Sequence, residues 1–184
     1  LARTEREVQS KEAATQFHQG KALLEDWRQT ESSDWRARAE QLAECIRCFD
    51  SGAELGHHDA SYELALLYTA GAGHLLKNDE EAFRLAKPAA DANHPDAAFL
   101  CAQLKMVQWY TAGCQHRDVF DEALYYFTVA AESEHHDAQF ILGYILFCQA
   151  CGIDDELYRL AASMQHDFAE YDDHVGGGGG GERY

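Results

Sequence analysis

Apolar residues along this chain recur at steps of three and four, the spacing that places them on one face of an α-helix. The helical patterns are rich in alanine and are separated by short polar turns. Only two prolines occur, and no run of alternating β-branched residues indicates a strand. The pattern therefore predicts a nearly all-helical protein.

One short phrase recurs at three junctions between the predicted helices. It ends in histidine, any residue, aspartate and alanine, and its copies are Gly56–Ala60, Asn93–Ala97 and Glu134–Ala138. The copies recur about every 40 residues, a period typical of stacked helical pairs. The phrase therefore predicts repeated helical hairpins.

The first helix of each hairpin keeps one register. A small residue is followed two positions later by an aromatic residue, and three positions after that by a second small residue. The four sets are Thr15, Phe17, Gly20; Ala60, Tyr62, Ala65; Ala97, Phe99, Ala102; and Ala138, Phe140, Gly143. Small residues at this step let neighbouring helices approach closely, and glycines in the turns within the hairpins supply the positive φ that reverses the chain.

The second hairpin carries the fullest pattern: Ala60-x-Tyr62-x-Leu64-Ala65-x-x-Tyr68-x-x-Gly71-x-Gly73, then Lys77–Ala82, Ala89-Ala90 and Asn93-His94. This order resembles the Sel-one-like repeat, a relative of the tetratricopeptide repeat. The resemblance extends over about residues 14–166. It implies an all-α, right-handed αα superhelical solenoid of about four helix-turn-helix repeats with a terminal capping helix.

The repeats also predict the domain limits. Residues 1–13 are expected to be a charged helical lead-in, and residues 14–175 the repeat domain. Its units are expected at about 14–57, 58–94, 95–135 and 136–166, with a cap over 167–175. Residues 176–184 begin with six glycines, which predicts a flexible linker with a short tail. An engineered linker is favoured, and the alternatives are a natural low-complexity tail and a splice that replaces deleted sequence.

Each expected unit ends in a histidine: His57, His94, His135 and His166. A histidine just past a helix can bond the last carbonyls and favour the helix dipole, so a structural role is expected. Asp59, Asp96 and Asp137 follow in the first turn of the next helix, where a carboxylate meets free N–H groups.

The aspartates also suggest a binding surface. In the related tetratricopeptide repeats, the position before the first small residue faces the concave side, so the resemblance implies an acidic ladder there. The expected partner-binding residues on the concave face are Asp59, Tyr62, Leu66, Asp96, Phe99, Gln103, Met106, Asp137, Phe140, Tyr144 and Phe147. Aromatic residues at repeat spacing also fit packing alone, and both interpretations stay open.

The net charge of −17, from 32 acidic and 15 basic residues, works against nucleic acid and anionic membranes as partners. It favours a basic protein or peptide partner, or simply a soluble surface. No apolar run approaches the roughly 20 residues that span a bilayer. Cytoplasmic localisation is favoured over export, because the regular disulfide spacing of exported members of the resembled family is missing.

The cysteines offer a different class of function. Cys45/Cys48 and Cys148/Cys151 are Cys-x-x-Cys pairs, which suit zinc or thiol redox chemistry. Cys45 and Cys48, however, occupy positions where the sister hairpins carry core residues such as Ala82. No motif of a catalytic or cofactor site is present, so no catalytic residue, cofactor or metal is expected.

The favoured function is therefore a non-catalytic protein-protein interaction module, acting as adaptor, regulator or inhibitor. The alternatives are a metal-binding or thiol-redox protein, the interaction domain of a larger enzyme, and an architectural spacer.

Overall fold

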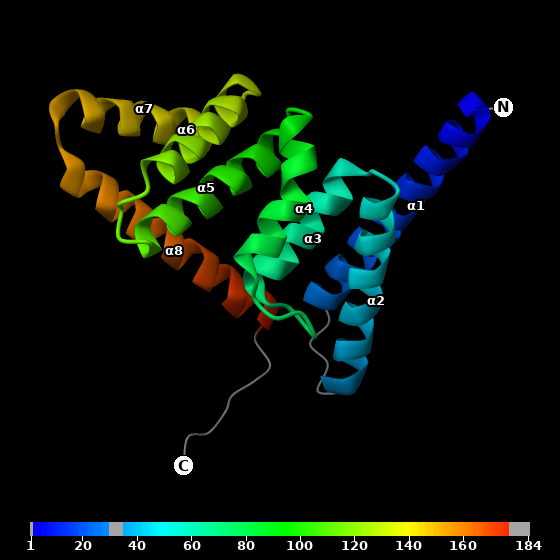
Figure 1. The fold of residues 1–184 in the computed structure, drawn as a ribbon. Helices are drawn as coiled ribbons and strands as arrows, with labels where there is room; N and C mark the ends of the chain where they lie inside the picture. The colour runs from blue at the N-terminus through cyan, green and yellow to red at the C-terminus, as the bar shows by residue number, and fades with distance from the viewer. Residues whose placement is uncertain (1, 30–34, 177–184) are drawn as a thin grey trace, which may run out of the picture. The chain divides into compact units, whose positions relative to one another are not determined.

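The structure is a computed structural model that describes residues 2–29 and 35–176. This part of the chain contains eight helices and no strand (Figure 1). The helices are α1 (Ala2–Gln29), α2 (Trp35–Glu54), α3 (His58–Ala70), α4 (Asp79–Asp91), α5 (Pro95–Thr111), α6 (Arg117–Glu132), α7 (His136–Cys151) and α8 (Asp154–Gly176). The predicted all-helical fold is confirmed.

The turns within the hairpins also follow the sequence. Gly71 and Gly73 lie between α3 and α4 with φ of 71° and 64°, and Gly113 follows α5 with φ of 73°. These values lie in the left-handed region that glycine adopts at little cost. The expected role of the turn glycines is confirmed.

The C-terminal helix differs from the prediction. A unit boundary at His166 and a separate cap over 167–175 were expected, but α8 continues unbroken from Asp154 to Gly176. No glycine or proline occurs between Met164 and Val175, so nothing interrupts the helical hydrogen bonds. The expected lead-in is likewise continuous with α1, and residues 177–184 of the expected tail lie outside the described residues.

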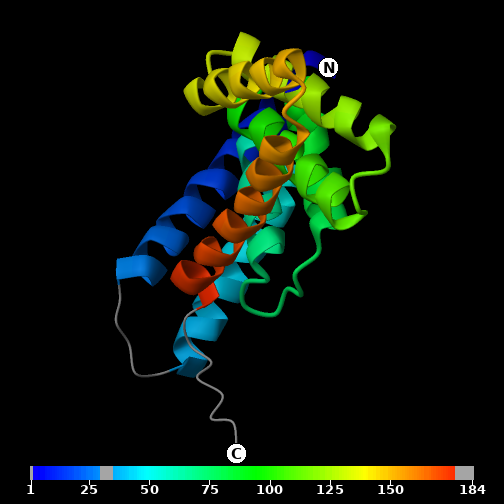
Figure 2. The same cartoon turned by 90° about the vertical axis from the view of Figure 1, so that its left-hand side faces the viewer.

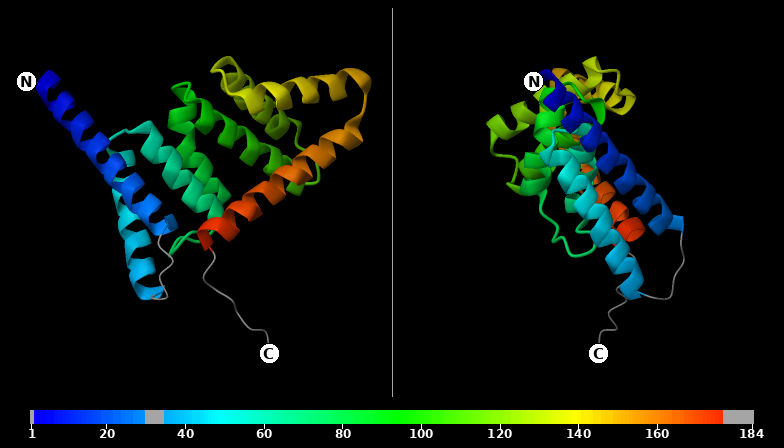
Figure 3. Two further views of the ribbon diagram at one scale, coloured as in Figure 1. Left: turned by 180° about the vertical axis from the view of Figure 1, so that it is seen from behind. Right: turned by 90° about the vertical axis from the view of Figure 1, so that its right-hand side faces the viewer.

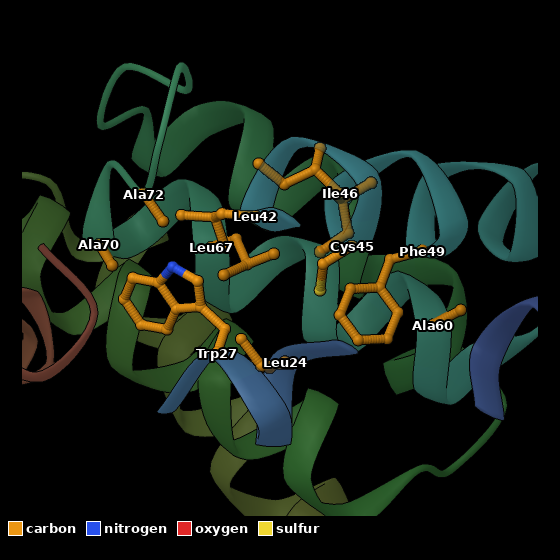
Figure 4. Close-up of a cluster of buried hydrophobic side chains, with 11 residues drawn as sticks. Leu24, Trp27, Leu42, Cys45, Ile46, Phe49, Ala60, Leu67, Ala70 and Ala72 are labelled. Atoms are coloured by element: carbon orange, nitrogen blue, oxygen red, sulfur yellow. The ribbon is translucent and has the colours of Figure 1, made fainter. Parts of the chain in front are cut away.

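By packing, the described residues divide into two compact units, one of residues 86–170 and one of residues 2–29 and 35–85 with 171–176. In the unit that begins the chain, α2 packs against both α1 and α3, and Figure 3 shows α1 running beside α2. Its core is the cluster drawn in Figure 4: Leu24, Trp27, Leu42, Cys45, Ile46, Phe49, Ala60, Leu64, Leu67, Ala70 and Ala72. Lys21 Nζ pairs with Glu63 Oε1 at 2.6 Å and ties α1 to α3.

Two glycines of this unit leave little room for a larger side chain. A Cβ on Gly20 of α1 would lie 2.7 Å from Cε1 of the buried Phe49 ring on α2. A Cβ on Gly52 of α2 would lie 2.9 Å from Cβ of Ala60 on α3. Carbon atoms at ordinary contact lie about 3.5–4.0 Å apart, so larger residues at these positions would push the helices apart.

The unit of residues 86–170 is centred on α6, which packs against both α5 and α7 (Figure 2). Buried aromatic rings on α5 and α6 fill its core: Trp109, Phe120, Tyr126 and Phe127. The Lys87 ammonium donates to the Tyr126 hydroxyl at 2.9 Å and pairs with Asp91 at 3.1 Å. The only polar group of this buried ring is thereby satisfied.

Candidate partner-binding surface

The three copies of the repeated phrase form the same corner between two helices. Each corner begins with a left-handed residue: Gly56 at φ 83°, Asn93 at φ 63° or Glu134 at φ 67°. The next residue is the histidine, whose backbone N–H donates to a carbonyl five residues earlier. These bonds join His57 to Gly52, His94 to Ala89 and His135 to Ala130, each at 3.0 Å. This is the Schellman pattern that ends a helix.

The histidine side chains begin the next helix. Nδ1 of each ring accepts a hydrogen bond from the third backbone N–H that follows. The bonds come from Ala60 to His57 at 3.4 Å, Ala97 to His94 at 3.2 Å and Ala138 to His135 at 3.2 Å. The expectation that these rings bond the preceding carbonyls is wrong. The left-handed residue turns the chain, and the free N–H groups of the new helix need an acceptor.

The register aromatics pack on these histidine rings. The Phe17 ring stacks on His57 with centroids 4.6 Å apart, and the Phe99 ring stacks on His135 at 4.2 Å. All three corners are therefore held by their backbone and by a ring nitrogen, and the corners at His57 and His135 also by an aromatic contact to the preceding first helix. For Phe17 and Phe99 the packing interpretation of the aromatic pattern is confirmed.

One corner predicts a pH dependence of stability. Burial lowers the pKa of His57; the His18 and His58 imidazoles add to this, and Asp59, whose Oδ2 lies 3.7 Å from Nδ1, opposes it. An unfolded histidine has a pKa of about 6.5. Between the two values the unfolded chain binds more protons, so the free energy of unfolding is expected to fall as the pH drops below about 6.5.

The measurement is urea unfolding between about pH 7.5 and pH 5.5. The matched variant is His57→Asn, which keeps a capping oxygen but does not titrate. The wild-type chain should lose more stability across this range than the variant. Equal losses would contradict a neutral capping role for His57.

The residues predicted to lie on the binding surface differ in their solvent exposure. Asp59, Asp96 and Asp137 are all exposed in the first turns of α3, α5 and α7. Phe140 and Phe147 are exposed too, at 76% and 59%. The half-buried members are Tyr62, Leu66, Phe99, Gln103 and Tyr144.

Met106 is the exception among the predicted residues. It is fully buried, so including it was wrong, because this turn of α5 places it in the core, where no partner can reach it.

Within residues 86–170, the structure brings the ends of α5 and α7 together. His135, which caps α7, has its Nε2 3.5 Å from Asp96 Oδ1 on α5. Asp96 and Asp137 therefore lie on the first turns of neighbouring helices.

Two residues of this neighbourhood were missed from the sequence. Glu156 accepts a hydrogen bond from the Tyr144 hydroxyl at 3.0 Å, and this bond raises the pKa of Tyr144 to about 12. Leu146 is 53% exposed on α7. The helical spacing of Leu146 from Phe140 and Gly143 was a signal for it, whereas nothing in the sequence pointed to Glu156.

The cysteine alternative meets a physical objection. Burial raises the pKa of the Cys45 thiol to about 12 and also raises that of Cys48. Cys45 Sγ donates to the Gly20 carbonyl at 3.3 Å, as a core thiol would. Zinc binding and disulfide exchange both need the thiolate, which a raised pKa disfavours.

Cys148 is buried as well, while Cys151 is exposed, and both are free. Among the residues that the structure describes, no three His, Cys, Asp or Glu side chains are arranged to hold a metal ion.

The described residues define an all-helical protein with repeated histidine-capped corners, each followed by an exposed aspartate. No family model matches the chain, and no solved structure matches it. It is similar to chitin synthase regulatory factor 2 of Schizosaccharomyces pombe, with 36% identity over 95 residues. The match covers 50% of this chain and 17% of that protein, so the chain spans only a small part of its relative. In the described ranges, no helix combines the length and hydropathy that a bilayer-spanning segment needs.

Proposed function

We propose that this chain is a non-catalytic adaptor or regulator that binds a basic peptide or protein segment. The partner would lie along the first helices of successive Sel-one-like hairpins stacked as a right-handed solenoid. The observation that carries this proposal is the exposed carboxylate at one equivalent place in all three corners: Asp59, Asp96 and Asp137.

The chemistry of the surface supports such a partner. Exposed carboxylates steer and orient a cationic ligand, while aromatic side chains beside them supply apolar contact area. Phe140, Tyr144 and Phe147 provide such area along α7, at positions that follow Asp137 with helical spacing. The net charge of −17 favours the encounter with a basic partner over a long range.

The matched relative supports the regulatory class, since its name describes a factor that regulates an enzyme. We extend only that class to this chain. Action as the interaction domain of a larger enzyme is compatible with the same surface. The raised pKa values of Cys45 and Cys48 disfavour their thiolates, so this pair is not proposed as a thiol-redox site.

The test is fluorescence anisotropy with a labelled short peptide in which arginine alternates with leucine and phenylalanine. Replacing Asp59, Asp96 and Asp137 together by asparagine is expected to weaken binding about tenfold, since exposed charge pairs contribute about 0.5 kcal/mol each. The variant should also show a flatter salt dependence between about 50 and 300 mM NaCl.

The matched control neutralises three exposed carboxylates in the first turns of the second helices. Glu80→Gln, Asp118→Asn and Asp155→Asn, on α4, α6 and α8, change the net charge and the helix-end charges equally. If both triple variants lower the affinity for the peptide to the same extent, the peptide is attracted by net charge alone. The proposed surface would then be refuted.

A further inference from the structure

Helix α7 presents an apolar stripe to solvent. Phe140, Leu146 and Phe147 keep 76%, 53% and 59% of their surface exposed. Gly143 lies on the same face, and a Cβ there would meet no atom within 4 Å. After Asp137 the helix carries no charged residue, although the chain as a whole is strongly acidic.

The equivalent positions on the other first helices are covered. On α5, Phe99 packs against His135 and lies 6.0 Å from the Phe127 ring of α6, and Ala102 is fully buried. On α1, Phe17 lies 6.2 Å from the Phe49 ring of α2. Phe140 and Gly143 of α7 thus occupy the positions at which α1 and α5 contact another helix.

Helix α8, which follows α7, does not cover Phe140. In the repeat register, Ala161-Ala162 of α8 corresponds to Ala130-Ala131 of α6. Tyr158 of α8 is therefore the equivalent of Phe127 of α6. Tyr158 stacks instead on Trp109 of α5, with centroids 5.6 Å apart and planes 21° from parallel. The aromatic residue expected to face Phe140 is therefore engaged elsewhere, and Phe140 stays exposed.

We propose that two copies of this chain pair through their α7 stripes about a two-fold axis. Phe140 and Phe147 lie at equal distances along the helix on either side of Gly143-Tyr144. An antiparallel crossing at this point sets Phe140 of one copy against the partner's Phe147, and the reverse. This is the self-complementary contact that two-fold symmetry requires. Gly143, with open space around it, lets the two helices approach closely.

The net charge limits where a second copy can dock. Two chains of net charge −17 repel each other over most of their surface. The α7 stripe is neutral at its centre, and its single carboxylate, Asp137, lies at the end of the helix. Pairing there buries apolar area. Glu156 of α8 lies beside the crossing, where it accepts a hydrogen bond from the Tyr144 hydroxyl at 3.0 Å, and its charge is compensated by the ion pair with Arg159.

The pair is expected to be weak. Two phenylalanines and one leucine per copy bury less than the 1,200–2,000 Å² or so of a standard stable interface. A dissociation constant on the order of 0.1 mM is therefore expected. Because screening relieves the repulsion between the copies, added salt should tighten the pair. Both the pairing and the proposed peptide surface use Phe140 and Phe147, but added salt acts in the opposite direction on a basic peptide, so the salt dependence distinguishes the two.

The experiment is sedimentation equilibrium of the whole chain from about 10 μM to 1 mM, at about 50 and 500 mM NaCl. The mean mass should rise from 20.6 kDa toward twice that value, more steeply at high salt. Phe140→Asp and Gly143→Leu should each raise the dissociation constant at least about tenfold. Both positions are exposed in the single chain, so circular dichroism should show unchanged helix content.

The matched control is Leu76→Asp, which adds the same charge at a residue that is 85% exposed between α3 and α4. It should leave the pairing nearly unchanged. A chain that stays monomeric at the highest concentration and salt would overturn the proposal and leave the stripe to another partner. Pairing that Phe140→Asp and Gly143→Leu do not weaken, or that Leu76→Asp weakens equally, would overturn it as well.

Discussion

Replacing His57, His94 and His135 by alanine in one variant is expected to lower the free energy of unfolding by about 4 kcal/mol. Each lost cap costs about 1 kcal/mol, and each of the two lost ring contacts, with Phe17 and Phe99, costs about 0.5 kcal/mol. Domains of this size are stable by about 5–15 kcal/mol, so the loss is a large fraction of the total. Thermal unfolding followed by circular dichroism should show a midpoint lower by about 10 °C.

The corresponding asparagine variant separates the two contributions. Asparagine is a strong N-cap residue but has no aromatic ring. It should therefore recover most of the stability that alanine loses and leave only the deficit of the ring contacts. If the alanine variant unfolds at the wild-type midpoint, the observed ring-nitrogen bonds to Ala60, Ala97 and Ala138 contribute nothing measurable.

The corner motif was predictable because its signals are local. A glycine or asparagine before a histidine, followed by an aspartate, marks the end of one helix and the start of the next. Gly56 and Asn93 fit this pattern directly, and Glu134 takes the same left-handed conformation because the rest of its corner is unchanged. The direction of the histidine ring was not predictable, since it depends on the backbone turn at the preceding residue.

The exposure of the surface residues was predictable only in part. Met106 and Phe140 both belong to first helices and were both predicted at the surface, yet one is fully buried and the other is 76% exposed. The repeat register gives the face of a helix, but burial depends on which other helix packs there. For Phe140 that helix would be α8, but its Tyr158 contacts Trp109 instead, and no repeat pattern predicts this contact.

Replacing Gly52 by leucine is expected to lower the free energy of unfolding by about 1–2 kcal/mol, since the cost of the packing clash exceeds the gain in helix propensity. The new side chain must occupy space in which a Cβ alone would lie 2.9 Å from Ala60 Cβ and 3.5 Å from the Ala13 carbonyl oxygen. Extra carbons in a packed contact force backbone shifts that typically cost 1–3 kcal/mol or so. Urea unfolding at low micromolar protein concentration measures the change.

Gly143→Leu is the matched control, because it makes the same substitution within a helix where no atom lies within 4 Å of the new Cβ. Leucine is a better helix former than glycine, so the control should be more stable than the wild type by up to about 1 kcal/mol. The two variants share that propensity gain, and the difference between them measures the close packing of α2 against α3. Equal stabilisation of both variants would mean that α2 and α3 separate at little cost, and that glycine at Gly52 is not required by the helix contact.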